Sequence, residues 1–141
     1  WEASEVDVYI SSYGGSAFEV DKIVHLLEDN FETINVYACG NLLSAGFYLF
    51  FRLKAKKRKL IGKTVGMFHK STWDHLTSFG VKKSTYEKAK VEHIEQLNEE
   101  QRLFCKNVLK FTEQELALIY EEEEDVYFDT KSMEEFIKVR K

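Results

Sequence analysis

The first half of the chain alternates between strand-like and helix-like patterns of hydrophobic residues. Apolar residues at positions 6, 8 and 10 alternate with polar ones, which is the two-residue period of a half-buried strand. Residues 34–39 are almost continuously apolar, a pattern typical of a central strand in a parallel sheet. Residues 59–61 and 64–68 predict two further short strands.

Two helices are expected between these strands. Ser16 and Glu19 have the spacing of a capping box, and residues 20–27 then place their apolar side chains on one helical face. A second, apolar helix begins at residues 44–46 and runs to about residue 54. The order strand, helix, strand, helix, strand predicts a parallel sheet with crossover helices.

The second half of the chain carries more charge and is mostly helical. Residues 84–110 have the periodicity of one long helix. Thr112 and Glu115 form a second capping box, which starts a short helix to about Tyr120. Residues 126–128 are strand-like, and a final helix begins near Asp129. Because there is no repeat and no low-complexity linker, we expect residues 1–141 to form a single α/β domain.

Composition and charge exclude several classes of protein. The 141 residues are 44% hydrophobic and 31% charged, which is too apolar for a disordered chain. The net charge is −4 and the pI is near 5.6, so we expect no nucleic-acid partner. The longest apolar stretch, residues 42–51, is too short to cross a bilayer, and we expect no membrane contact. We interpret the basic run at residues 54–59 as solvated surface, because it lacks interleaved aromatic residues.

The two cysteines and the first residue bear on the compartment and the extent of the protein. Cys39 and Cys105 both lie in apolar segments, which predicts reduced core residues rather than a disulfide. This favours a cytoplasmic or otherwise reducing compartment. The chain begins on Trp1 and enters a strand almost at once, so we expect a further segment upstream.

Ser44 is the first candidate for chemistry. It follows a buried strand and opens a helix, so its hydroxyl would lie at the carboxyl end of a parallel strand, where α/β folds place their sites. The helix N-terminus would supply free N–H groups to stabilise an oxyanion. The nucleophile-elbow pattern is half met, since Gly46 is present but Leu42 replaces the other glycine. From spacing alone, a simple N-cap role for Ser44 is favoured.

Gly14, Gly15 and His69 are further candidates at the same edge of the sheet. The glycine pair would let a ligand approach the backbone closely, although the pair alone is better explained by a tight turn. Its spacing fits neither a dinucleotide loop nor a P-loop, which excludes nucleotide binding. His69 ends an apolar strand and could act as a base on Ser44, although lone histidines at strand ends are more often structural. No histidines or cysteines have metal-ligand spacing, so we expect no metal and no cofactor.

Three motifs, in order along the chain, resemble those of the proteolytic subunit of Clp protease, ClpP. That family carries S-P-G-G, then G-x-x-x-S-M-G, then M-x-H. Here the motifs read Ser12-Tyr13-Gly14-Gly15, then G-N-L-L-S-A-G at residues 40–46, then Met67-Phe68-His69. The resemblance covers residues 5–137. It implies an α/β fold of the ClpP/crotonase type, with stacked βαβ units and a protruding helical handle at residues 82–110.

The resemblance implies a serine endopeptidase that cleaves peptide bonds through an acyl-enzyme. By the motif match, Ser44 would be the nucleophile and His69 the general base. The backbone N–H groups of Gly15 and Ala45 would form the oxyanion hole. No cofactor belongs to this chemistry.

The resemblance also implies a carboxylate that completes a catalytic triad with Ser44 and His69. Its assignment depends on a shorter sequence pattern than the other two. The family places its aspartate just before the last helix, in the pattern D-x-x-(M/L)-(S/T), and residues 125–129 resemble that pattern. Asp125 would therefore be the acid. The segment before it is longer than the family's, so Glu121 and Glu122 stay open as alternatives, since either type of carboxylate can hold an imidazole.

The resemblance also implies an assembly and its partners. These are an oligomeric ring, peptide or unfolded-protein substrates, and an ATP-dependent unfoldase. Tyr13 replaces the family's proline, and residues 71–80 lack its glycine-rich strand, which leaves the stacking of two rings open. A divergent or phage-type member fits as well as a cellular one. Two other functions remain open: a catalytically silent ClpP-like structural subunit, and a crotonase-like acyl-CoA enzyme, whose chemistry needs no serine nucleophile.

Overall fold

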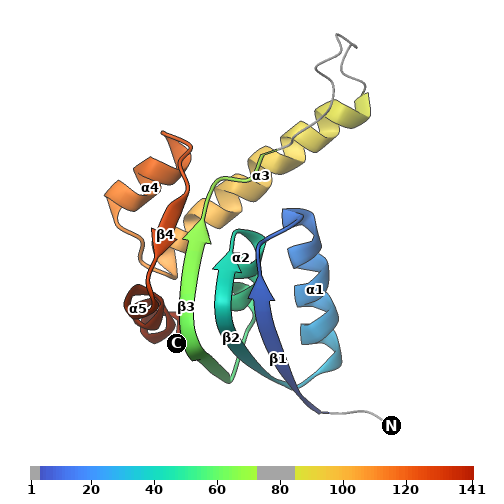
Figure 1. Ribbon diagram of the computed structural model, residues 1–141. Helices are drawn as coiled ribbons and strands as arrows, with labels where there is room; N and C mark the ends of the chain where they lie inside the picture. The colour runs from blue at the N-terminus through green and yellow to red at the C-terminus, as the bar shows by residue number, and fades with distance from the viewer. Residues whose placement is uncertain (1–3, 73–84) are drawn as a thin grey trace.

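One four-stranded sheet organises the computed structural model, which describes residues 4–72 and 85–141 (Figure 1). The strands stand in the order β1-β2-β3-β4, with bounds β1 Glu5–Ser12, β2 Thr33–Leu43, β3 Lys57–Phe68 and β4 Val126–Phe128. The first three strands are parallel, whereas β4 is antiparallel to β3. The expected parallel sheet is therefore present, with one antiparallel edge strand added by the second half of the chain.

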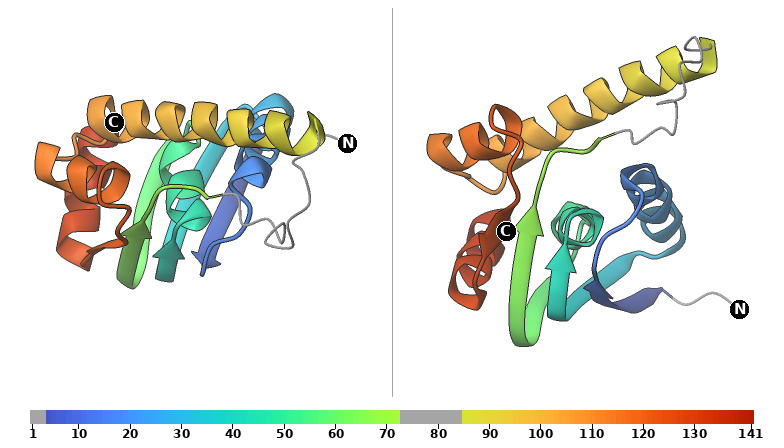
Figure 2. Two further views of the ribbon diagram at one scale, coloured as in Figure 1. Left: turned by 90° about the horizontal axis from the view of Figure 1, so that it is seen from above. Right: turned by 45° about the horizontal axis from the view of Figure 1, so that its top comes forward.

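The helices are α1 Ala17–Asn30, α2 Ala45–Arg52, α3 Thr85–Asn107, α4 Glu113–Tyr120 and α5 Thr130–Arg140. The connecting helices α1 and α2 lie together on one face of the sheet (Figures 1 and 2). The long helix α3 passes the carboxyl ends of the strands, from the side of α4 to the side of α1 (Figure 2). The mixed α/β architecture with a protruding long helix is the one expected from the sequence.

Aromatic contacts attach α3 to both connecting helices. The ring of Phe18 on α1 lies 4.7 Å from that of His93, and the ring of Tyr48 on α2 lies 5.5 Å from that of Phe104. Ring pairs at these separations contribute to stability beyond the area that they bury. These contacts fix α3 beside the edge of the sheet at which the parallel strands end.

The long helix ends earlier than the sequence pattern indicates. It stops at Asn107 rather than Lys110, because Lys110 adopts a positive φ of 61° that no helix continues. The N–H of Phe111 then donates to Cys105 O at 2.9 Å and closes the end. Residues 82–84 of the expected handle lie outside the described residues.

Phenylalanine rings from both halves of the chain meet in the core. Phe47 on α2 is 0% exposed, and its ring centroid lies 4.9–6.3 Å from those of five others. The five are Phe51, Phe68, Phe111, Phe128 and Phe136. The apolar residues of α2 are thus covered within the chain itself, and the second half of the chain is packed directly onto the sheet.

Two expectations for the strands are wrong. The segments 59–61 and 64–68 form a single strand, β3, because the pairing shifts between Ala38 and Gly40 of β2 and absorbs the extra residues of β3. Cys39 lies at this irregularity and is exposed, so it is not a core residue. Cys105, by contrast, is buried as expected.

Of the two expected capping boxes, one forms. Thr112 Oγ1 accepts from the N–H of Glu115 at 3.1 Å, and the Glu115 side chain accepts from the N–H of Thr112 at 2.8 Å. Ser16 is the N-cap of α1 but makes no side-chain cap bond. Its expected partner Glu19 instead pairs with Lys22 at 3.1 Å, so α1 begins without a capping box.

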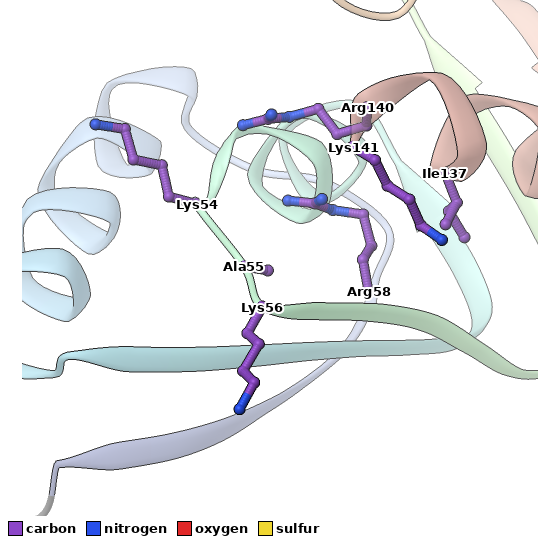
Figure 3. Close-up of a pocket in the computed structure, with 7 residues that line it drawn as sticks. All are labelled: Lys54, Ala55, Lys56, Arg58, Ile137, Arg140 and Lys141. Carbon is purple, nitrogen blue, oxygen red and sulfur yellow. The ribbon is translucent and has the colours of Figure 1, made fainter.

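The basic run at residues 54–59 is partly structural. Arg58 and Arg140 donate through their Nε atoms to carbonyl oxygens in the last turn of α2, at 2.9 and 2.7 Å. Burial, and then the charge of Arg140, lower the pKa of Arg58 to about 10. Figure 3 shows the two guanidinium groups side by side at this helix end, while Lys54 and Lys56 point away from them. The arginines therefore stabilise the C-terminus of α2, and the two lysines belong to the solvated surface.

Candidate active site

Ser44 occupies the turn between β2 and α2 in a backbone conformation rare for serine, with φ 55° and ψ −117°. Its N–H donates to Met67 O at 2.7 Å, which ties the turn to β3. Its side chain makes no cap hydrogen bond to α2. Ser44 therefore occupies the N-cap position of α2 but does not cap the helix through its side chain, and the hydroxyl is available to another partner.

Close packing between two turns requires glycine beside Ser44. Gly14 has a φ of +110°, and a Cβ there would lie 3.0 Å from Ser44 Cβ. A Cβ on Gly46 would lie 2.8 Å from Ser12 Cβ. A Cβ on Gly15, by contrast, would meet nothing within 4 Å. The first two glycines let the β1–α1 turn pack against the start of α2, and Gly15 faces open space.

His69 is the first residue after β3, and its imidazole contacts side chains on both sides. Nε2 lies 2.6 Å from Ser44 Oγ, and Nδ1 lies 3.2 Å from Asp125 Oδ1. The His69 side chain is 38% exposed and that of Asp125 is 51% exposed. Parallel strands β2 and β3 end at the same edge of the sheet, which is why Ser44 and His69 meet.

Asp125 reaches His69 through the pairing of β3 with β4. In this antiparallel pair Phe68 lies opposite Val126, so the next residues outward, His69 and Asp125, also lie opposite each other. The two other candidate acids are placed differently. Glu121 and Glu122 follow α4, where their N–H groups donate to Ala117 O. Among the described residues, the side chain that contacts Nδ1 of the imidazole is that of Asp125 and not that of either glutamate.

The two residues whose N–H groups are expected to stabilise an oxyanion, Gly15 and Ala45, both line pockets at this edge of the sheet. Ala45 is the first residue of α2, so its N–H has no acceptor within the helix. Gly15 precedes α1 and borders the same pocket as Ser44 and His69. Both residues also border a neighbouring apolar hollow of about 200 Å³, whose walls include Val20 and Leu49. Gly15 thus lies between the pocket of Ser44 and His69 and the apolar hollow.

The pocket in front of Ser44 and His69 has a volume of about 250 Å³. Its wall is built from the start of α1, the segment after β3 and the long helix α3. The lining residues are Gly15, Ser16, Ala17, Phe18, Ser44, His69, Ser71, Thr72 and Ile94. A hydroxyl that contacts an imidazole, which itself contacts a carboxylate, is an arrangement suited to nucleophilic attack on a carbonyl group.

Two buried polar residues on α3 were not singled out from the sequence. Asn98 and Gln101 are 7% and 2% exposed, and both contact Ser71, two residues after His69. Their spacing in the sequence could have revealed their burial, because they fall on the same helical face as the apolar residues Ile94, Leu97 and Cys105. Polar residues in the buried row of a helix require partners, and here those partners follow the histidine.

Within the described ranges, no group of three or more His, Cys, Asp or Glu side chains is arranged to hold a metal ion. None of the helices in that part of the chain is both long and apolar enough to cross a membrane.

Comparison with known proteins bears on the fold. No family model matches this sequence, and no curated protein matches it either. Among solved structures, the chain is similar to a mutant of ClpP1 from Listeria monocytogenes, with a TM-score of 0.68 and 15% sequence identity. The match covers 95% of this chain and 71% of that one. The chain therefore has a ClpP-like α/β fold.

Proposed function

We propose that this protein is a serine endopeptidase with Ser44 as its nucleophile. The observation that carries the proposal is the 2.6 Å contact between Ser44 Oγ and His69 Nε2, on a ClpP-like fold. His69 would take the hydroxyl proton as Ser44 attacks the scissile carbonyl carbon. It would then give that proton to the leaving amine, which leaves an acyl-enzyme for water to hydrolyse.

Asp125 would hold the imidazole in the tautomer that accepts the proton at Nε2, with Nδ1–H donating to the carboxylate. The supporting distance is 3.2 Å between Nδ1 and Asp125 Oδ1. The oxyanion of the tetrahedral intermediate would accept from the N–H groups of Gly15 and Ala45. The substrate would occupy the pocket of about 250 Å³ beside them, whose lining includes the exposed Thr72.

The contact between Ser44 and His69 favours a peptidase over the acyl-CoA enzyme. A crotonase-like enzyme stabilises a thioester oxyanion with backbone N–H groups and has no need of a serine paired with histidine. A ClpP-like subunit without activity would need no such pair either. Peptides or unfolded proteins as substrates, a ring of identical copies and an ATP-dependent unfoldase remain parts of the proposal that the resemblance supplies.

Labelling with a fluorophosphonate probe tests the nucleophile. We expect one adduct, which peptide mapping by mass spectrometry assigns to Ser44. Ser44→Ala should abolish labelling and lower kcat on peptide substrates by about 10³- to 10⁶-fold, with the thermal unfolding midpoint nearly unchanged. Ser132→Ala, on α5, serves as a matched control and should label like the wild type. An adduct on another serine, or peptidase activity retained at a tenth or more in Ser44→Ala, would contradict the proposal.

A further inference from the structure

The side chain of Asn98 binds both backbone groups of a single residue near the site. Its Oδ1 accepts from the N–H of Ser71 at 2.8 Å, and its Nδ2 donates to Ser71 O at 2.8 Å. In an antiparallel sheet, a residue of the neighbouring strand makes this same pair of bonds. The carboxamide of Asn98 thus takes the place of a strand beside the chain that follows His69.

The chain after His69 has few other attachments. β3 and its pairing with β4 both end one residue before the histidine. Beyond it, in the part of the chain that the structure describes, Lys70 pairs with the exposed Glu123 at 2.9 Å, and the Ser71 hydroxyl lies 3.4 Å from a glutamine of α3. Exposed ion pairs contribute little to stability, and a contact of 3.4 Å is a weak hydrogen bond. Among the described residues, the two short bonds to Asn98 are therefore the main anchor of residues 70–72.

A buried asparagine is costly unless its hydrogen bonds are made. Asn98 is 7% exposed and lies in the helical row between Leu97 and Gln101, where an apolar side chain would need no partner. Its carboxamide matches the two backbone groups of Ser71 in both chemistry and distance. The side chain therefore links the long helix α3 to the segment that carries His69.

We propose that Asn98 is a positioning residue for His69. By holding Ser71, it fixes the main chain on the carboxyl side of the histidine and keeps Nε2 within 2.6 Å of Ser44 Oγ. This inference rests on the proposed function, because it assumes that the Ser44–His69 contact performs the chemistry. A displacement of α3 along its axis would move Ser71 and lengthen that contact.

Two variants of Asn98 separate positioning from mere packing. Asn98→Ala removes both bonds and should lower kcat by about 10- to 100-fold, with KM changed less than about threefold, since a misplacement of 1 Å costs rates of this order. Asn98→Asp keeps the shape but can donate to Ser71 O only while its carboxyl group is protonated. Its rate relative to wild type should therefore fall as the pH rises. Asn98 and Ser71 line a second pocket, and the charged residues among its lining are Lys70 and Glu95.

The exposed amide of Gln96, on the same helix, offers a matched control. Gln96→Ala should leave kcat and the pH profile within about twofold of wild type, as surface substitutions usually do. Thermal unfolding of each variant reports whether it is folded. If Asn98→Ala fails to fold, the near-isosteric Asn98→Asp still gives the pH dependence.

NMR spectra of protein labelled at its histidines report on His69 without turnover. His69→Gln assigns the signals. In both Asn98 variants the His69 signals should shift or broaden, while those of His25 and His93 stay in place. Folded variants with unchanged rates, pH profiles and His69 signals would overturn the proposal. A wild type that neither cleaves peptides nor takes the probe, but whose His69 signals respond to Asn98, would contradict the proposed function alone and support the positioning role.

Discussion

Three side chains at the edge of the sheet are held by three different constraints. Ser44 has a positive φ, and the hydrogen bond from its N–H to Met67 O fixes its turn to β3. His69 is held by the end of β3, and Asp125 by the antiparallel pairing of β4. The contact to Ser44 is short, whereas the contact to Asp125 is 3.2 Å and half exposed. Of the two contacts that His69 makes, the one to the Asp125 carboxylate is therefore the weaker.

Substitution of the three candidate acids distinguishes their roles. Asp125→Asn should lower kcat by about 10⁴-fold, because an amide at this position favours the wrong imidazole tautomer. Glu121→Gln and Glu122→Gln should change kcat by less than about tenfold, since it is Asp125 that contacts the ring among the described residues. Steady-state kinetics on a fluorogenic peptide measures all three. A large loss in a glutamate variant, with Asp125→Asn still active, would move the acid to that glutamate.

At the scale of elements, the site depends on how closely two turns approach. The β1–α1 turn and the start of α2 meet at Ser12 and Gly46, where there is no room for a further carbon atom. Ser12 Oγ also accepts from the N–H of Gly14, so a shift of Ser12 would disturb the turn that carries Gly15. The geometry around Ser44 is thus a property of packed elements and not of one loop.

Alanine should destabilise the fold at Gly46 but not at Gly15. Gly46→Ala places Cβ 2.8 Å from Ser12 Cβ, so the free energy of unfolding should fall by about 1–3 kcal/mol, as overpacking does in other cores. Gly15→Ala meets nothing within 4 Å and should change the free energy of unfolding by less than about 0.5 kcal/mol. Urea denaturation measures both. Equal stability of the two variants would mean that the turns are further apart than described.

At the scale of the whole molecule, the aromatic core buries groups that ionise at high pH. Burial raises the pKa of Tyr48 to about 12, and burial also raises the pKa values of the Cys105 thiol and the Tyr120 phenol. These groups lose their protons more readily in the unfolded chain than in the folded one. Their stabilising contribution is therefore complete below the ordinary thiol pKa of 9.0 and declines as the pH rises above it.

Alkaline conditions should weaken the fold, because these buried groups ionise more readily once the chain unfolds. The thiol of Cys105 alone should remove about 1.4 kcal/mol per pH unit above its unfolded pKa. Urea midpoints measured between about pH 8 and about pH 10.5 follow this loss. Cys105→Ala is the control, because without the thiol the free energy of unfolding should depend less steeply on pH. A midpoint that stays constant over this range would contradict the burial of these groups.

The face of the sheet opposite α1 and α2 is where an assembly would be expected. Tyr9 and Tyr37 stack there at 5.0 Å, and Tyr9, Ile61 and Tyr127 are exposed. Helices α1 and α2 lie on the other face (Figure 2). Exposed apolar side chains grouped on one face favour association of copies. Sedimentation at micromolar concentration should give a mass well above 16.6 kDa, and Tyr9→Glu should reduce it. A stable wild-type monomer would contradict the ring.

The sequence determined the features that depend on local patterns. The order of strands and helices follows from periodicity, and the capping box of Thr112 and Glu115 follows from residues three apart. The motifs around Ser44 and His69 suggested a shared edge, because parallel strands joined by crossover helices end on the same side. Such features need only neighbours in the chain, and for this reason they can be recognised without the fold.

Only the tertiary structure decided which distant residues meet. Asp125 contacts His69 across 56 positions because β4 pairs with β3 in one register, and the sequence pattern left Glu121 and Glu122 open. In the sequence, Asn98 cannot be told from the other polar residues of a charged helix, and only the folded chain places Ser71 against it. Pairing register and helix docking depend on the packing of the entire core around Phe47, and no local run of residues specifies them.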